Sequence, residues 1–134
     1  MQDYNYLHTN CFEITVELSM VKNPRESTLS TEWNNNKNAL LEYMKWVHKG
    51  VKGTVTDADG KPIPGASISV FDNVANKQID HIVRSNAPFG DYYRILIPGT
   101  YSVTVSASGY QSATSRVTVT SGNAAILDFT LSSN

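Results

Sequence analysis

The sequence lacks the features that mark several large classes of protein. Its single cysteine, Cys11, excludes a disulfide within the chain and indicates no redox compartment. No apolar run reaches the roughly 18 residues of a membrane-spanning helix, and Met1 to Tyr6 has neither the basic nor the apolar region of a signal peptide. Eleven basic and twelve acidic residues give a formal charge of −1 without a basic cluster. We therefore expect no nucleic-acid partner and no membrane segment in this chain.

The composition is that of a globular protein. Hydrophobic residues make up 40% of the chain and charged residues 17%, a balance that favours a packed core over disorder. A chain of 134 residues has room for one domain, or for one small domain and a further segment.

The first fifty residues predict a strand followed by a helix. Apolar and polar residues alternate over Phe12–Leu18, which is typical of a strand with one buried face. Pro24 interrupts the pattern, and Ser30 can cap a helix over about residues 31–49. Gly50 follows the last basic residues of that helix and is suited to end it.

From Val51 onward, short alternating runs separated by turn residues predict a β-sandwich of about seven strands. One of the predicted strands covers residues 124–131 without a break. Pro98-Gly-Thr100 predicts a hairpin turn between strands at residues 92–97 and 101–107. The domain boundary falls near Gly50, which gives an N-terminal part at 1–50 and a β-sandwich at 51–134.

The segment from Asp3 to Ser19, with Leu7-His-Thr-Asn10 and Phe12-Glu-Ile-Thr-Val-Glu17, resembles part of a known enzyme family. It is similar to the segment that carries the catalytic glutamate in zinc metallocarboxypeptidases of the carboxypeptidase E, M, N and D type. The β-rich part, with Pro64-Gly-Ala-Ser-Ile-Ser-Val70 and Gly90-Asp-Tyr-Tyr-Arg94, resembles the carboxypeptidase regulatory-like domain. That domain has a transthyretin-like fold.

The two resemblances together imply a mainly β chain with a transthyretin-like seven-stranded β-sandwich. A strand and a helix, the remnant of an α/β carboxypeptidase domain, would precede the sandwich. We expect the chain to be the C-terminal part of such an enzyme, holding one catalytic residue and no zinc site. The resemblance also implies an extracellular or secretory-pathway location.

The resemblance assigns roles to three residues. Glu17 would act as the general base on a zinc-bound water and would later pass the proton to the departing amine. Gln2 and Thr15 would line the pocket for the C-terminal side chain of a peptide substrate, which is Arg or Lys in this subfamily. Thr15 shares the polar face of the predicted strand with Glu17. Periodicity alone favours a plainer interpretation of Glu17 as an exposed charge on a half-buried strand.

The histidines do not predict a metal site. The family binds zinc through a His-X-X-Glu pair and a distant histidine, and no His-X-X-Glu occurs in this sequence. We interpret His8, His48 and His81 as structural residues, and Cys11 as a small packed side chain rather than a nucleophile. Zinc is therefore expected in the parent enzyme and not in this chain.

Two functions remain open from the sequence. In the first, the chain is part of a zinc carboxypeptidase that removes C-terminal Arg or Lys, and is inactive alone because Glu17 has no metal beside it. In the second, it is a non-catalytic β-sandwich that serves as a folding or protein-interaction module and can self-associate through strand edges.

Overall fold

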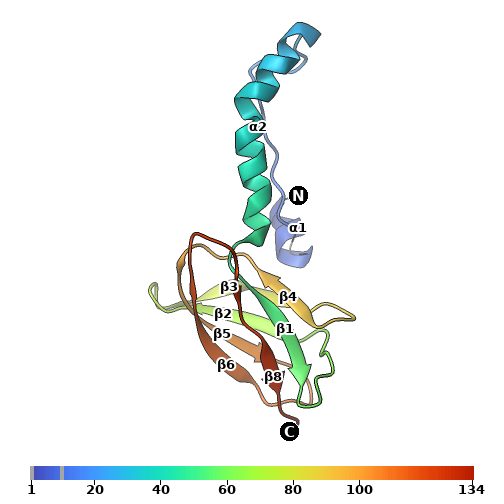
Figure 1. Ribbon diagram of the computed structural model, residues 1–134, viewed down its shortest axis with the longest axis vertical. Coiled ribbons are helices and arrows are strands. Elements are labelled where there is room, and N and C mark those ends of the chain that lie inside the picture. Colours follow the sequence, from blue (N-terminus) through green and yellow to red (C-terminus); the bar gives the residue numbers. More distant parts are fainter. Residues whose placement is uncertain (1, 10) are drawn as a thin grey trace. The chain divides into compact units, whose positions relative to one another are not determined.

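The computed structural model describes residues 2–9 and 11–134, which form two compact units, Met1–Val47 and His48–Asn134. The first unit is helical and the second is built of strands, as Figure 1 shows. The mainly β fold with a helix before the strands, predicted from the sequence, is confirmed.

The first unit contains one long helix. Helix α1 spans Gln2–Thr9, a 3₁₀ turn spans Glu26–Thr28, and helix α2 spans Leu29–Lys45 before a second 3₁₀ turn at Trp46–His48. The predicted helix is confirmed, but it begins two residues earlier, because the turn at Glu26–Thr28 leads directly into it. Thr28 therefore occupies the N-cap position expected for Ser30, and its hydroxyl donates to the Arg25 carbonyl oxygen at 2.8 Å.

The predicted strand at Phe12–Leu18 is wrong for this structure. Residues 11–18 form no strand, and the apolar face of the predicted strand is largely open to solvent. Ile14, Val16 and Leu18 are 51%, 46% and 45% exposed. A strand forms only when a neighbouring strand takes its backbone hydrogen bonds, and alternation specifies a face without supplying that neighbour.

The second unit contains eight strands. They are β1 (Val51–Asp57), β2 (Ser67–Asp72), β3 (Lys77–Arg84), β4 (Asp91–Arg94), β5 (Gly99–Ser106), β6 (Ala113–Val119), β7 (Ala125–Ile126) and β8 (Phe129–Leu131). The count exceeds the predicted seven because the segment predicted as one strand at 124–131 is divided between β7 and β8.

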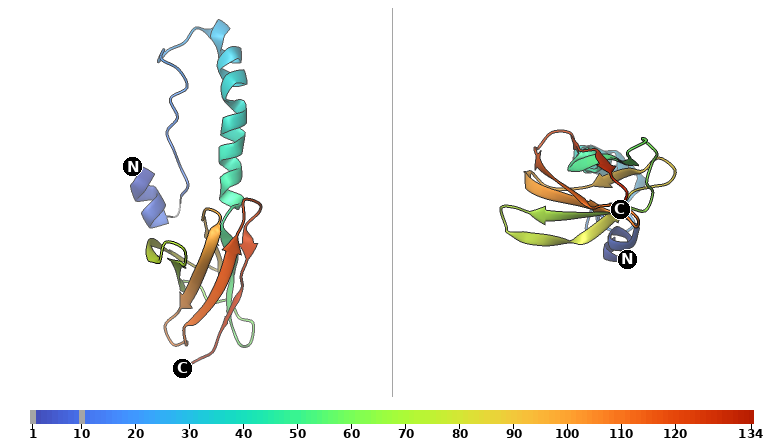
Figure 2. Two further views of the ribbon diagram at one scale, coloured as in Figure 1. Left: turned by 90° about the vertical axis from the view of Figure 1, so that its left-hand side faces the viewer. Right: turned by 90° about the horizontal axis from the view of Figure 1, so that it is seen from below.

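The strands form two sheets that pack face to face (Figures 1 and 2). One sheet has the order β4-β1-β7, with β8 also paired to β1, and the other has the order β3-β2-β5-β6. β1 runs parallel to β7 and β8, and the remaining strand pairs are antiparallel. Strands β4 and β5 belong to different sheets, so the predicted hairpin at residues 98–100 is wrong. That link instead crosses from one sheet to the other.

The core lies between the two sheets and follows the alternation of the strands. Side chains that face inward are almost fully buried, whereas their neighbours on the same strands are partly or fully exposed. The largest fully buried side chains are those of Tyr92, Ile68, Leu131, Val51, Val55, Val70, Val103 and Val105. At about 25 cal/mol per Å² of buried apolar surface, such residues supply the main driving force for folding this unit.

Candidate functional site

Glu17 lies in an irregular segment between helices α1 and α2. The backbone after it turns at Ser19, whose hydroxyl donates to the Val21 carbonyl oxygen at 3.1 Å and accepts from the Val21 N–H at 3.2 Å. Pro24 then lies before the 3₁₀ turn that starts helix α2. The segment is therefore shaped by a local turn rather than by pairing with a sheet.

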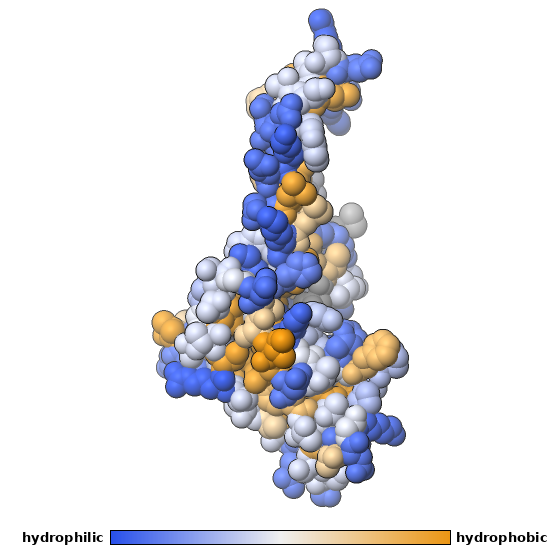
Figure 3. All heavy atoms as spheres, in the orientation of Figure 1, coloured by the Kyte–Doolittle hydropathy of each residue, from blue (hydrophilic) through white to orange (hydrophobic). Residues whose placement is uncertain are grey.

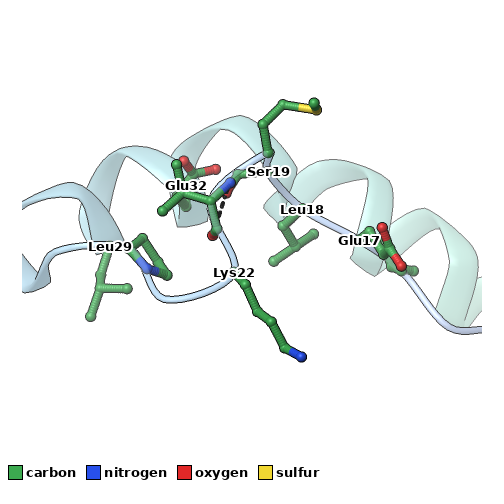
Figure 4. A pocket seen from close by; sticks show the side chains of 10 residues that line it. Glu17, Leu18, Ser19, Lys22, Leu29 and Glu32 are labelled. Carbon is green, nitrogen blue, oxygen red and sulfur yellow. Dashed lines mark hydrogen bonds between the residues drawn. The ribbon is translucent and has the colours of Figure 1, made fainter.

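A hollow of about 640 Å³ opens beside this turn. Figure 4 shows Glu17, Leu18, Ser19 and Lys22 around it, together with Leu29 and Glu32 of helix α2. Its charged side chains are two carboxylates and one ammonium, and no ion pair joins Glu17 to Lys22 in the part of the chain that the structure describes. The hollow is a surface depression with both apolar and charged lining residues, and the Glu17 carboxylate at its rim is exposed.

The three residues predicted for the site do not meet in this structure. Gln2 lines a separate hollow of about 240 Å³ with residues of helix α1 and the segment after it. Thr15 is exposed and lines neither hollow, although it lies two residues from Glu17. The shared polar face predicted for Thr15 and Glu17 depends on a strand, and the strand is absent here.

The residues just before Glu17 are tied to both helices of the first unit. The Asn5 side-chain amide of helix α1 donates to the Glu13 carboxylate at 2.8 Å. The Phe12 ring stacks on Tyr43 of helix α2, with the ring centroids 4.7 Å apart. Burial raises the pKa of the Tyr43 phenol, and the nearby Cys11 and Glu13 raise it further. Tyr43 could not be singled out from the sequence, because its contact with Phe12 spans thirty-one positions.

The residues present do not fit a zinc ion. In residues 2–9 and 11–134 there is no group of three or more His, Cys, Asp or Glu side chains that could hold a metal. The His8 ring lies against that of Tyr4 within helix α1, tilted by 34° with the centroids 4.3 Å apart. His81 lies in strand β3 and is 8% exposed, and its pKa is lowered by burial and by the nearby Arg94 guanidinium.

The second unit buries polar side chains that form hydrogen bonds with its backbone. The Ser85 hydroxyl donates to the Ile63 carbonyl oxygen at 2.6 Å and accepts from the Ala66 N–H at 2.9 Å. The Arg94 guanidinium is 3% exposed and donates to the Ile95 carbonyl oxygen at 3.1 Å. Neither the burial of Arg94 nor its nearness to His81 was predicted from the sequence, because the two residues lie in different sheets.

Exposed apolar side chains occur on the second unit as well. Ile126 of strand β7 is 71% exposed, and Phe89, in the loop before strand β4, is 72% exposed. Figure 3 shows apolar residues on the face of the sandwich that it presents, with hydrophilic residues beside them. None of the helices in the described residues has the length and apolar character needed to cross a membrane.

Residues 50–132 match the carboxypeptidase regulatory-like domain, and the chain belongs to this family. Its match to curated carboxypeptidases is longer. The chain is 50% identical over 131 residues to the carboxypeptidase N catalytic chain of Rattus norvegicus, covering 98% of this chain and 27% of that protein. It is 49% identical over 132 residues to carboxypeptidase D of Homo sapiens, covering 98% of this chain and 9% of that protein.

A solved structure of low sequence identity has a similar fold. The Bacillus anthracis TIE protein aligns with 63% of this chain and 16% of its own chain, at a TM-score of 0.50 and 19% identity. A match of this kind supports the β-sandwich architecture alone. The relatives that match both units are carboxypeptidases, and the chain spans about a quarter or less of their length.

Proposed function

We propose that this chain is part of a zinc metallocarboxypeptidase that removes C-terminal Arg or Lys from peptides and proteins. The observation that carries the proposal is the extent of the match to the carboxypeptidase N catalytic chain. The match covers 98% of this chain and so includes the helical unit as well as the β-sandwich. A free-standing regulatory-like domain would account for residues 50–132 alone.

In this proposal Glu17 is the general base of the peptidase. Its carboxylate is exposed beside a hollow, so a substrate and a water molecule can reach it. Gln2 and Thr15 would join it in the complete enzyme to line the pocket for the basic side chain. That requires the segment around Glu17 to become a strand of a larger sheet, where Thr15 and Glu17 share one face.

The zinc ligands would lie in the part of the relatives that this chain does not span. The chain alone would then have no measurable peptidase activity, because a general base without the group it assists contributes little. As in the relatives that the sequence resembles, the complete enzyme would act in the secretory pathway or outside the cell.

The β-sandwich would serve the enzyme as an accessory domain with its own core. Its buried residues come from strands of both sheets within His48–Asn134, so that it can fold without the helical unit. The same observation supports the second candidate function, a non-catalytic folding or protein-interaction module.

A hybrid enzyme tests the proposal. In the carboxypeptidase N catalytic chain, the matching quarter is replaced by this chain, and release of arginine from a peptide ending in Arg is measured. We expect activity from this hybrid. Glu17→Gln should lower kcat by at least about 1,000-fold, the loss expected when an essential proton acceptor is removed. Glu13→Gln is the matched control and should keep kcat within about threefold, because Glu13 has no assigned chemical role.

Two results would contradict this assignment. Equal activity of the Glu17→Gln and unsubstituted hybrids would remove the role of Glu17. Arginine release by this chain alone, with about one zinc per chain by mass spectrometry, would instead reveal a metal site in the chain itself.

A further inference from the structure

The edge strands of the two sheets differ in how well they are protected against pairing with a further strand. They are β4, β7 and β8 in one sheet and β3 and β6 in the other (Figure 1). An edge strand is protected when it is short, irregular or highly charged, because each of these features hinders the addition of another strand. The edge strands can therefore be compared by length, regularity and charge.

Every edge strand except β6 carries such protection. β4 has four residues, two of them charged, while β7 and β8 have two and three residues. β3 has eight residues, but its register with β2 shifts once and it carries Lys77, Asp80 and Arg84. β6 has seven residues, pairs with β5 in one unbroken register, contains no proline and has one charged side chain, Arg116. β6 is thus the edge best suited to accept a further strand.

Hydrogen bonds of the neighbouring strands show which backbone groups of β6 face outward. The Asn73 N–H donates to the Thr100 carbonyl oxygen at 3.1 Å, which directs the backbone polar groups of Thr100 towards β2. Backbone groups alternate in direction along a strand, so those of the next residue of β5 point towards β6 and bond to Val117, its partner in the register. By the same alternation, Arg116 and Thr118 direct their N–H and C=O groups away from β5. No strand of the described residues pairs with that side of β6.

A second copy of this chain supplies a fitting strand, because an antiparallel edge is complementary to itself. When β6 meets β6 of another copy about a two-fold axis, each outward N–H meets an outward carbonyl oxygen. A pairing centred on Arg116 would place two guanidinium groups opposite each other, which is unfavourable. A pairing centred on Val117 places Arg116 opposite Thr118 and brings together two half-buried valine side chains. A centre at Ser115 would bring two hydroxyls together instead, with less apolar surface to bury.

We propose that strand β6 is a self-association edge: two copies join their β3-β2-β5-β6 sheets into one continuous sheet, with Val117 on the two-fold axis. Arg116 of each copy would exchange both backbone hydrogen bonds with Thr118 of the other. The interface is small, because each copy contributes a single edge strand, so we expect a reversible dimer rather than an obligate one. The proposal concerns the β-sandwich and is independent of the catalytic role of Glu17.

Amide hydrogen exchange of the chain as it is tests the pairing. At about 10 µM the amides of Arg116 and Thr118 should exchange quickly, whereas that of Val117, bonded to β5, should be protected. At about 1 mM, exchange at Arg116 and Thr118 should slow by at least about fivefold, because mass action favours the dimer. Thr114 should stay fast, since its opposite position lies beyond Val119, the end of β6. Exchange at Arg116 and Thr118 that is independent of concentration would overturn the proposal, as would slowing at Thr114 in place of Thr118.

Disulfide trapping tests the position of the axis. All variants carry Cys11→Ser, so that the introduced cysteine is the only thiol. Val117→Cys should give a covalent dimer under mild oxidation, because opposite residues that are not hydrogen-bonded have Cα atoms about 4.5 Å apart. The matched control is Ser115→Cys, whose two copies would lie about 13 Å apart and should stay monomeric. Equal trapping of both variants would indicate random collision and overturn the proposal.

A proline substitution separates this edge from the other exposed apolar surfaces. Arg116→Pro removes an outward N–H and leaves the hydrogen bonds to β5 in place, a position at which edge strands accept proline. It should abolish the dimer in sedimentation equilibrium, whereas Arg116→Ala, which keeps the N–H, should dimerise at least as well as the unsubstituted chain. Association that survives Arg116→Pro in a folded chain would place the contact elsewhere and overturn the proposal. If Arg116→Pro unfolds, the exchange and trapping experiments decide, since neither needs a proline.

Discussion

The Tyr92 hydroxyl donates a hydrogen bond of 2.6 Å to the carbonyl oxygen of Leu127. Tyr92 is a fully buried residue of strand β4, and Leu127 lies at the break between strands β7 and β8. Burial raises the pKa of this phenol, and the nearby Asp128 carboxylate raises it further. The bond therefore links edge strand β4 to the residues between β7 and β8, which lie on the other side of strand β1. The raised pKa keeps the phenol neutral.

Replacing Tyr92 by Phe removes this bond and keeps the ring. We expect the free energy of unfolding to fall by about 1–3 kcal/mol, because the Leu127 carbonyl loses a buried partner. Urea unfolding followed by circular dichroism measures the change. Tyr93→Phe, on the outward face of the same strand, should change stability by less than about 0.5 kcal/mol. Equal effects of both substitutions would contradict this account of the bond.

Gly53 allows the break between β7 and β8 to pass close to strand β1. A Cβ atom at this position would lie 2.6 Å from the Leu127 carbonyl carbon and 3.0 Å from the Asp128 side-chain oxygen. The Asp128 carboxylate accepts from the Thr54 N–H at 2.8 Å and from the Thr54 hydroxyl at 3.0 Å, so it has little freedom to move.

Gly53→Ala should therefore destabilise the sandwich by more than about 3 kcal/mol, the range of severe backbone clashes. The matched control is Gly122→Ala, whose Cβ would have its nearest neighbour at 3.5 Å, an ordinary contact. The thermal midpoint should fall steeply for the first variant and stay within a few degrees for the second. A stable Gly53→Ala protein would show that the break can relax away from β1.

His81 gives the sandwich a pH-dependent stability. Its folded-state pKa is below the ordinary value of 6.5, first through burial and then through the Arg94 guanidinium. The unfolded chain therefore binds the proton more readily than the folded one, so stability decreases as the pH falls below about 6.5 towards the folded-state pKa. This contribution is fully present above the unfolded-state pKa and is lost as the pH falls through the folded-state pKa.

Urea unfolding between pH 7.5 and 5 tests this effect. His81→Gln should flatten the dependence, whereas His48→Gln, at an exposed position, should leave the slope as it is. A slope that survives in His81→Gln would assign the pH dependence to other groups.

Residues 18–25 should be the first cleaved by a protease. The segment lacks the hydrogen-bonded ladder that protects a strand, and it contains the tryptic sites after Lys22 and Arg25. Trypsin in a brief digestion should cut there first and leave the residues of the β-sandwich together, as judged by mass spectrometry. First cuts after Lys52 or Arg116, both inside strands, would show that the β-sandwich opens before residues 18–25 are cut, and would contradict this prediction.

Much of the sandwich was predictable because its strands carry their pattern locally. Alternation in residues such as those of β2 and β5 reflects which side chains face the core, and turn residues mark where each strand ends. The helix at Leu29–Lys45 was predictable for the same reason, with a displaced start. Of the candidate site, the motif around Glu17 singled this residue out, and its role stays a prediction. Its surroundings in the structure could not be predicted, because they depend on residues of helix α2.

The sequence by itself determined the class of helix α2 and of the sandwich strands, because side-chain periodicity and turn chemistry act over a few residues. The tertiary structure decided which strands pair, and it separated β4 from β5 and β7 from β8. It also left Phe12–Leu18 without a strand. Those outcomes depend on partners far away in the chain, which satisfy backbone hydrogen bonds and fill space that no local pattern specifies.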